Sequence, residues 1–402
     1  MSLDKSRLDG ILDKYVSADP DSKDTLRTAA LIVKDKAGKT VYSNALGTHN
    51  FETNSPPFTA DSVGWIASMT KLITAVCAMQ LVEKGNIGLD DEVGEVVPHL
   101  SKIEVLKGFE EDGTPILTKP NKALTLRYLL THSSGFTYDA SNADLIKWSA
   151  YIGRTVNAQS RTLEGITFPL IFDPGEGWSY SVGIDWAGRV VEALSNSTLG
   201  EYMERHIFEP LSMSSTTFQI HKRPELAARR TTIAWRSSPD APLGLGDGND
   251  PAPKNPEIEM GGGGLFTTAN DYAEFLGALI SGDSRILKPE SIAELFKPQL
   301  DDPKHFQAFC DGPLHDAICP EFPHGLQLNY ALGGKVNLED VPGKRRKGSM
   351  AWSGATNPHW WIDPETGIAA VIFTQIFPFG DPVLNSLYNK LERAIYQTFK
   401  TE

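Results

Sequence analysis

Residues 61–85 read DSVGWIASMTKLITAVCAMQLVEKG, and this stretch decides how the whole chain is interpreted. After Ser68 the apolar residues recur at helical spacing until Gly85, which predicts a helix that Ser68 opens. Lys71 then lies one turn further along the same face, within reach of the serine oxygen. The helix N-terminus also favours negative charge that develops at Ser68. The pattern predicts a nucleophilic serine, and its alternative is an N-cap serine followed by a solvated lysine.

A serine hydroxyl is a weak nucleophile, so this hypothesis needs a proton acceptor, either a neutral Lys71 or a second group. Residues 172–188, FDPGEGWSYSVGIDWAG, place Tyr180 in a glycine-rich loop before a helix predicted from Ile184. Tyr180 could accept the proton, or it could be a packed aromatic residue beside Trp178.

A third segment, KGSMAWSGA at residues 347–355, predicts a short strand that ends in small residues. Backbone can approach a substrate closely at such an end, and an amide there could donate to an oxyanion. The alternative is that Trp352 packs in the core while the glycines form a turn.

Composition limits the classes of partner. The chain has 402 residues, 40% of them apolar and 22% charged, which predicts a folded protein with a large core. A net charge of −13 argues against nucleic acid or a membrane surface as the partner and favours a small molecule. The opening residues, MSLDKSRLDGILDKYV, lack the apolar core of a secretion signal, and no segment is long enough to span a membrane. We therefore expect a cytoplasmic protein, and nothing in the composition demands more than a monomer.

The three cysteines are too few for a disulfide framework, and Cys77 lies in an apolar helical pattern that predicts a core position. The other two belong to a run of possible metal ligands, His305, Cys310, His315, Cys319 and His324. The spacing of this run matches no common zinc site, so we expect no metal there.

Both ends of the chain carry mixed helix and strand patterns. The predicted elements are a helix at 8–16, a β-hairpin at 29–46, a second hairpin at 360–376 and a closing helix at 384–399. Residues 89–195 are mostly helical in pattern. The stretch 236–264, which ends in Gly261–Gly264, predicts a long loop that returns toward a site. We therefore expect an α+β fold, with an α/β domain from residues 1–88 and 196–402 and a mainly helical domain from 89–195.

Together these motifs resemble the serine β-lactamase and penicillin-binding-protein superfamily. The resemblance is strongest to its class C β-lactamase-like branch, which includes the family VIII carboxylesterases and the lovastatin acyltransferase type. It extends over most of the chain and rests on five blocks in this order: Ser68 to Lys71, Leu129 to Gly135, Pro174 to Gly188, Gly261 to Thr268, and Arg345 to Ser349.

The resemblance implies a β-lactamase/transpeptidase-like fold, in which an antiparallel sheet flanked by helices carries a mainly helical insertion. Ser68 would be the nucleophile, and Lys71 and Tyr180 would share the general acid and base work. The amides of Ser68 and Ala355 would form the oxyanion hole. No metal or organic cofactor is implied, and His132 would be structural rather than catalytic.

Two departures from the β-lactamase pattern bear on the substrate. β-Lactamases carry Y-x-N and K-[ST]-G, where this chain has Tyr180-Ser181-Val182 and Trp352-Ser353-Gly354. Valine cannot make the hydrogen bonds of an amide, and tryptophan cannot pair with a drug carboxylate. We therefore expect an apolar substrate pocket, lined by Trp352, Ser353, Gly354, Tyr138 and Trp178.

The leading hypothesis is a serine acyl-enzyme hydrolase or transesterase that acts on small-molecule esters or thioesters, of the kind found in polyketide secondary metabolism. One alternative is a β-lactamase or D-alanyl peptidase, and another is a catalytically silent binding protein with the same fold. An acyl carrier or a coenzyme A-type donor could supply the acyl group. The basic run Lys344–Lys347 could attract such a donor, although a solvated turn is the expected interpretation.

Overall fold

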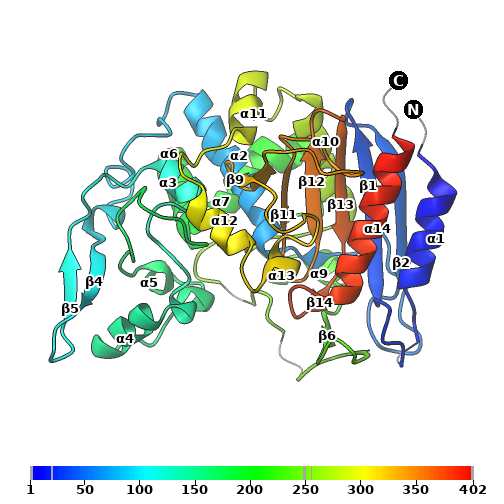
Figure 1. The fold of residues 1–402 in the computed structure, drawn as a ribbon, viewed down its shortest axis with the longest axis horizontal. Helices are drawn as coiled ribbons and strands as arrows, with labels where there is room; N and C mark the ends of the chain where they lie inside the picture. The colour runs from blue at the N-terminus through cyan, green and yellow to red at the C-terminus, as the bar shows by residue number, and fades with distance from the viewer. Residues whose placement is uncertain (1–2, 20, 248–249, 255, 400–402) are drawn as a thin grey trace.

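The centre of the fold is a seven-stranded antiparallel sheet, with the strand order β2-β1-β13-β12-β11-β10-β9 (Figure 1). The structure is a computed structural model that describes residues 3–19, 21–247, 250–254 and 256–399. The strands of this sheet are β1 (Thr28–Asp35), β2 (Thr40–Gly47), β9 (Leu328–Tyr330), β10 (Lys335–Asn337), β11 (Met350–Ser353), β12 (His359–Asp363) and β13 (Ile368–Phe373). The α+β class and the antiparallel sheet predicted from the sequence are confirmed.

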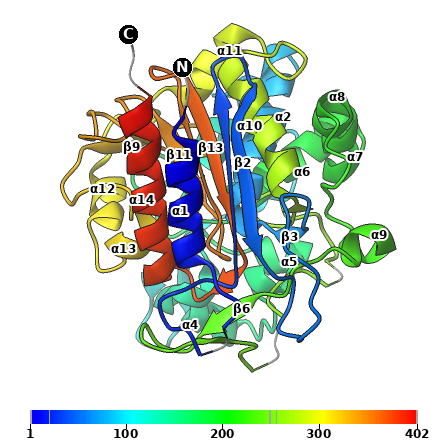
Figure 2. The same ribbon diagram turned by 90° about the vertical axis from the view of Figure 1, so that its right-hand side faces the viewer.

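Helices cover both faces of the sheet. The longer ones are α1 (Lys5–Tyr15), α2 (Thr70–Glu83), α4 (Ala143–Tyr151), α6 (Gly183–Ser195), α10 (Ala269–Ser281), α11 (Pro289–Phe296), α12 (Lys304–Cys310) and α14 (Pro382–Thr398). The shorter ones are α3 (Leu126–Leu130), α5 (Leu163–Ile166), α7 (Leu199–Met203), α8 (Glu209–Leu211), α9 (Pro224–Ala227) and α13 (His315–Ile318). Helices α1 and α14, from opposite ends of the chain, lie side by side on one face (Figures 1 and 2).

The central strands are apolar on both sides because both faces are covered. In β1, Leu31 and Val33 pack into the cluster that contains α1 and α14. Ala30 and Ile32 pack into the cluster on the opposite face, with α2 and α10. This explains why the strand reads as an unbroken apolar run rather than as an alternating one.

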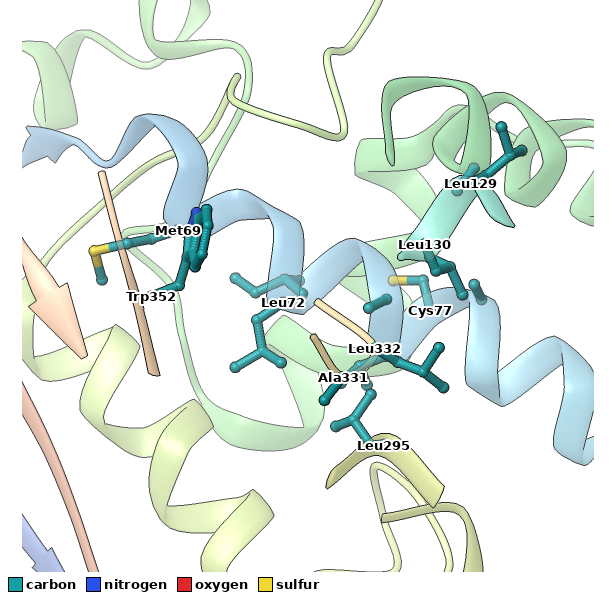
Figure 3. Packing of buried hydrophobic residues seen from close by; sticks show 14 of the residues in the cluster. Met69, Leu72, Cys77, Leu129, Leu130, Leu295, Ala331, Leu332 and Trp352 are labelled. Carbon is teal, nitrogen blue, oxygen red and sulfur yellow. The ribbon is translucent and has the colours of Figure 1, made fainter. Parts of the chain in front are cut away.

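Helix α2 is the central helix of the larger cluster, and all its residues from Thr70 to Leu81 are buried. It contacts α6 and α11. Figure 3 shows part of this packing, with Met69, Leu72, Cys77, Leu129, Leu130, Leu295, Ala331 and Leu332. Cys77 is a core residue, as its position in the sequence pattern predicts.

Two elements differ from expectation. The helical stretch 89–195 contains a β-hairpin, β4 (Val105–Phe109) with β5 (Pro115–Thr118). A register shift within β4 breaks the alternation by which such a strand is recognised. The strand predicted to run through Ile376 ends instead at Phe373. The next strand, β14 (Ile376–Phe377), belongs to a second sheet. There it pairs in parallel with β6 (Ala234–Arg236), which in turn pairs with β7 (Leu243–Gly244).

The interpretation of Lys344–Lys347 as a solvated turn is wrong for its first half. Arg345 is fully buried, and its Nε lies 2.7 Å from a carboxylate oxygen of Glu392 on α14. Lys344 is also buried and lies 3.2 Å from the second oxygen of Glu392. A buried charge needs a partner, and α14 supplies one that is 47 residues away in sequence.

The domain division at residues 88 and 195 stays a prediction. In the described part of the chain, no helix is both long and apolar enough to cross a membrane.

Candidate active site

Ser68 lies in a short 3-10 turn, Ala67–Met69, that leads directly into α2. Ala67 has a φ of 43°, in the left-handed region that residues with a β-carbon seldom adopt. The backbone just before it is held by Gln375, whose side chain accepts from the Trp65 amide at 3.1 Å and donates to the Trp65 carbonyl at 3.1 Å. The turn is thus fixed by tertiary contacts as well as by the helix that follows.

The end of β11 lies against this turn. A β-carbon on Gly354 would stand 2.3 Å from the carbonyl oxygen of Ile66, so only glycine allows the two segments to come so close. This contact places Ala355, the predicted second oxyanion donor, in the wall of the same cavity as Ser68.

Lys71 is completely buried, with its ammonium group surrounded by oxygen atoms. Its Nζ lies 3.2 Å from Ser68 Oγ, 3.4 Å from the Tyr138 hydroxyl and 2.6 Å from the Gly262 carbonyl oxygen. Burial alone would lower the pKa of Lys71, but the oxygens of Tyr138 and Tyr180 and the Asp185 carboxylate outweigh it and raise that pKa. These contacts favour the charged form of Lys71.

Tyr180 lies in the irregular segment before α6, with its ring centroid 4.6 Å from Lys71 Nζ. Its hydroxyl accepts a hydrogen bond from Trp352 Nε1 at 3.2 Å, which ties the loop to β11. The same loop is anchored by His132, whose Nδ1 lies 3.0 Å from Ser181 Oγ. Burial and the charge of Lys71 lower the pKa of His132, which is consistent with a neutral, structural imidazole.

The predicted return of the loop 236–264 to the site is confirmed by Gly262. Its carbonyl accepts from Lys71, and its amide donates to Asp185 Oδ1 at 2.7 Å. Burial raises the pKa of Asp185 to about 6, against the opposing effects of Lys71 and the Gly262 amide. Both residues lie in blocks that the sequence analysis singled out, but it assigned neither of them a catalytic or binding role.

Two cavities meet at Ser68, Tyr180 and Ala355. The first, of about 270 Å³, is largely apolar and is completed by Phe309, Leu314, Ile318, Trp352, Ser353, Gly354 and Phe379. The second, of about 350 Å³, is more polar, and its lining includes Tyr138, Asp139, Ala140, Ser141, Ala158, Gln159, Arg161 and Asp185.

Most of the predicted site residues come together. Trp352, Ser353 and Gly354 line the first cavity, whereas Tyr138 lines the second. Trp178 lines neither, because it is buried behind Tyr180 against Phe306 and Phe309, with ring centroids 4.8 and 4.9 Å away. Phe309 and Arg161 were missed by sequence reasoning, and no local motif marks either of them.

Among the described residues, one group brings three possible metal-ligating side chains close together. Ligand atoms of Asp311, His315 and His324 lie within 4.8 Å of one another. Both ring nitrogens of His315 already face backbone carbonyl oxygens, those of Cys310 at 2.8 Å and Phe322 at 3.0 Å. A metal ligand needs a free nitrogen lone pair, so this group does not fit a metal site as it stands.

A serine and a lysine one turn apart at the start of a helix, facing a tyrosine and the end of an antiparallel strand, define the class of penicillin-binding-protein-like serine acyl-enzymes. The chain belongs to the β-lactamase family, whose profile matches residues 12–394.

Proteins that are similar in sequence and structure narrow the class of enzyme within this family. Monacolin J acid methylbutanoyltransferase from Aspergillus terreus is 32% identical, over 92% of this chain and 92% of its own length. Lovastatin esterase from Penicillium rubens is 33% identical, over 92% of this chain and 94% of its own length. The solved structure of simvastatin synthase from Aspergillus terreus superposes with a TM-score of 0.90 at 30% identity, and covers 98% of each chain. The protein is thus an enzyme of the acyltransferase and esterase class.

Proposed function

We propose that Ser68 forms an acyl-enzyme from a small ester or thioester and passes the acyl group to the hydroxyl of a second small molecule. The observation that carries this proposal is the pair of cavities that meet at Ser68. An apolar cavity suits an acyl chain, and a second cavity of mixed polarity that shares Ser68 gives an acceptor alcohol a route to the acyl carbonyl. An esterase would place the acyl and alcohol parts of one ester in the same two cavities, so the experiment below is what separates transfer from hydrolysis.

In the first half of the reaction, Ser68 Oγ attacks the carbonyl carbon of the donor. Because Lys71 is held as a cation, the proposal gives proton acceptance to Tyr180, with the ammonium of Lys71 stabilising the phenolate that forms. The bond from the carbonyl carbon to the leaving sulfur or oxygen then breaks, and the proton from Tyr180 passes to the departing thiol or alcohol.

The second half reverses these steps with a new partner. The acceptor hydroxyl attacks the acyl carbon, Tyr180 takes its proton, and the bond to Ser68 Oγ breaks as the proton returns to the serine. In both halves the amides of Ser68 and Ala355 are proposed to donate to the oxyanion, a role worth about 10²–10³ in rate per donor. The close packing of Gly354 on Ile66 supports this role, because it fixes the distance between the two segments.

The substrates follow from the cavities and from the similar proteins. The first cavity suits a short or branched acyl chain, consistent with methylbutanoyl transfer in the Aspergillus terreus relative. We propose a polyketide-type alcohol as acceptor and a thioester of an acyl carrier or coenzyme A type as donor. We also propose that the enzyme is cytoplasmic, supported by three cysteines that are all free and buried, and that it is a monomer.

Intact-mass spectrometry tests the chemistry. The protein is mixed with a panel of short acyl thioesters and p-nitrophenyl esters, with and without an added alcohol, beside Ser68→Ala as control. A mass gain confined to wild type, cleared faster by the alcohol than by water, is the expected result. Faster clearance by water would make the enzyme an esterase, and a complete lack of adduct and turnover would favour the silent binding protein.

A further inference from the structure

Two of the three cysteines lie together beside the wall of the first cavity. Cys310 is the last residue of α12, and Cys319 directly follows α13, nine positions further along the chain. The two helices contact each other. Both side chains are buried, and the thiol of Cys310 donates a hydrogen bond to the sulfur of Cys319. The fold thus brings two free sulfurs together as direct neighbours.

A buried cation makes the two sulfurs chemically different. Lys335 Nζ lies 3.7 Å from Cys319 Sγ and 3.0 Å from the Glu321 carboxylate, and it also donates to the Ile318 carbonyl. Burial alone would raise the pKa of Cys319, but the hydrogen bond from Cys310 and the charge of Lys335 outweigh it and lower that pKa. The same hydrogen bond and burial raise the pKa of Cys310. A thiol that ionises readily next to one that stays protonated suits an attacking and a resolving cysteine.

The third cysteine supplies the contrast. Cys77 is buried in α2, and burial raises the pKa of its thiol. A protonated thiol in an apolar core is inert toward oxidants. We therefore expect any oxidation to distinguish the pair from Cys77.

Each cysteine of the pair directly follows a residue that lines the first cavity. These two residues are Phe309 and Ile318, and Leu314, between them in the sequence, lines the same cavity. The ring of Phe309 lies 6.5 Å from that of Tyr180, the proposed proton acceptor. A disulfide holds its two sulfurs about 2 Å apart, closer than a hydrogen bond does, so closing one draws α12 and α13 together. The wall of the cavity would move with them.

A small oxidant has a route to the pair through the same segment. Helix α12 has seven residues and α13 has four, and Leu314 between them is 64% exposed. Short helices at the surface open locally at a low cost in free energy. The sulfurs can therefore react without unfolding of the whole chain.

We infer that Cys310 and Cys319 are a redox-sensitive pair, which a peroxide converts to a disulfide that alters the first cavity and slows acylation of Ser68. The chemistry of the pair stands by itself, whereas its effect on acylation rests on the proposed function.

The oxidation has two steps. The sulfur of Cys319 attacks a peroxide oxygen, an S–O bond forms as the O–O bond breaks, and the other oxygen leaves as water with the thiol proton of Cys319. The sulfur of Cys310 then attacks that of Cys319, an S–S bond forms as the S–O bond breaks, and the second water leaves with the proton of Cys310. The two sulfurs together give two electrons to the peroxide.

Peptide mass spectrometry tests the chemistry. The reduced protein is treated with hydrogen peroxide, its remaining thiols are alkylated, and it is digested with trypsin. The peptide 305–335 contains both Cys310 and Cys319 and no methionine. It should lose about 2 Da, the mass of two hydrogen atoms, and carry no alkyl group, whereas Cys77 should be alkylated. Two alkyl groups on this peptide, or added oxygen in place of the mass loss, would overturn the inference.

Stopped-flow acylation tests the effect on the cavity. Rates with p-nitrophenyl acetate and p-nitrophenyl butanoate are compared in the reduced, the oxidised and the re-reduced protein. Oxidation should lower kcat/KM for the butanoate ester by about 10- to 100-fold and for the acetate ester by less, because the longer chain fills more of the cavity. Reduction with dithiothreitol should restore both rates. Unchanged rates in the oxidised protein, or equal losses with the two esters, would overturn the effect on the cavity.

Matched variants assign the effect to the pair. Cys310→Ala and Cys319→Ala each remove one sulfur and should acylate at a rate that peroxide does not change. Cys77→Ala is the control and should keep both the mass loss and the slower acylation. Slower acylation by peroxide-treated Cys310→Ala would place the sensitive group elsewhere and overturn the inference. Absence of acylation in reduced wild type would overturn the proposed function, while the mass of peptide 305–335 would still decide the chemistry of the pair.

Discussion

Lys71 and Asp185 are joined through one residue, because Gly262 accepts from Lys71 Nζ at 2.6 Å and donates to Asp185 Oδ1 at 2.7 Å. A β-carbon on Gly262 would lie 2.6 Å from the Asp185 carboxylate, so the arrangement requires a glycine there. The link sets both the position of the ammonium beside Ser68 and the negative charge that balances it.

This link predicts the acid limb of the pH profile. Asp185, with a pKa of about 6, loses its proton as the pH rises through that value and then supplies the counter-charge for Lys71. In wild type, kcat/KM for acylation should therefore rise between about pH 5 and 7. Asp185→Asn should abolish this limb and lower the plateau by about 10- to 100-fold. Stopped-flow acylation with a p-nitrophenyl ester measures both, and an unchanged limb in Asp185→Asn would contradict the link.

The two tyrosines beside Lys71 should differ in their effects. Tyr180→Phe removes the proposed proton acceptor and should lower the acylation rate by about 10²–10⁴. Tyr138→Phe removes a 3.4 Å contact with Lys71 and should cost about 10-fold. The pair is a matched test, since each change deletes one hydroxyl near the same ammonium. A larger effect of Tyr138→Phe would transfer the base role to Tyr138.

Gly354 should be sensitive to a single methyl group. Gly354→Ala places a β-carbon 2.3 Å from the Ile66 carbonyl, which cannot move aside, so the end of β11 must shift away from Ser68. A shift of about 1 Å at a reacting centre costs on the order of 10² in rate. Gly10→Ala, in α1 with open space around it, is the control and should raise the free energy of unfolding by up to about 1 kcal/mol. Acylation rates and chemical denaturation of both variants test this prediction. An unchanged acylation rate in Gly354→Ala would contradict it.

The buried pair Arg345–Glu392 should matter for stability rather than for chemistry. Both side chains are 0% exposed, so Glu392→Gln leaves a buried cation poorly paired and should lower the free energy of unfolding by about 3–5 kcal/mol. Asp340→Asn breaks the neighbouring exposed pair with Arg346 and should cost at most about 1 kcal/mol. Urea denaturation gives the free energy of unfolding of both variants. Equal losses would mean that burial does not determine how much each ion pair contributes to stability.

Glu321 should make the fold sensitive to acid. Burial alone would raise the pKa of Glu321, but Lys335 and Arg345 outweigh it and lower that pKa to about 2. A carboxyl whose folded pKa is depressed stabilises the fold above its ordinary pKa, and this contribution is lost as pH falls from about 4.5 toward 2. The free energy of unfolding should thus fall over this range by a few kcal/mol, on the order set by about 1.4 kcal/mol per pKa unit. Glu321→Gln should be less stable at neutral pH and show a smaller fall.

Local patterns predicted the helix that carries Lys71 and the elements at both ends of the chain. The helix after Ser68, the hairpin at residues 29–46 and the closing helix each have an apolar spacing that needs no distant contact to be recognised. The hairpin β4–β5 was missed because its bulge breaks that spacing. The predicted strand at 368–376 was too long because Gln375 turns its amide toward Trp65 instead of continuing the ladder.

The sequence by itself determined the spacing of Ser68 and Lys71, because three residues of helix fix that relationship within one turn. Tertiary structure alone decided that Gly262 joins Lys71 to Asp185, that Trp178 lines neither cavity and that Arg161 lines the second one. These contacts join residues that lie far apart in the chain, at distances set by how helices and strands pack. No local pattern of residues records such a distance.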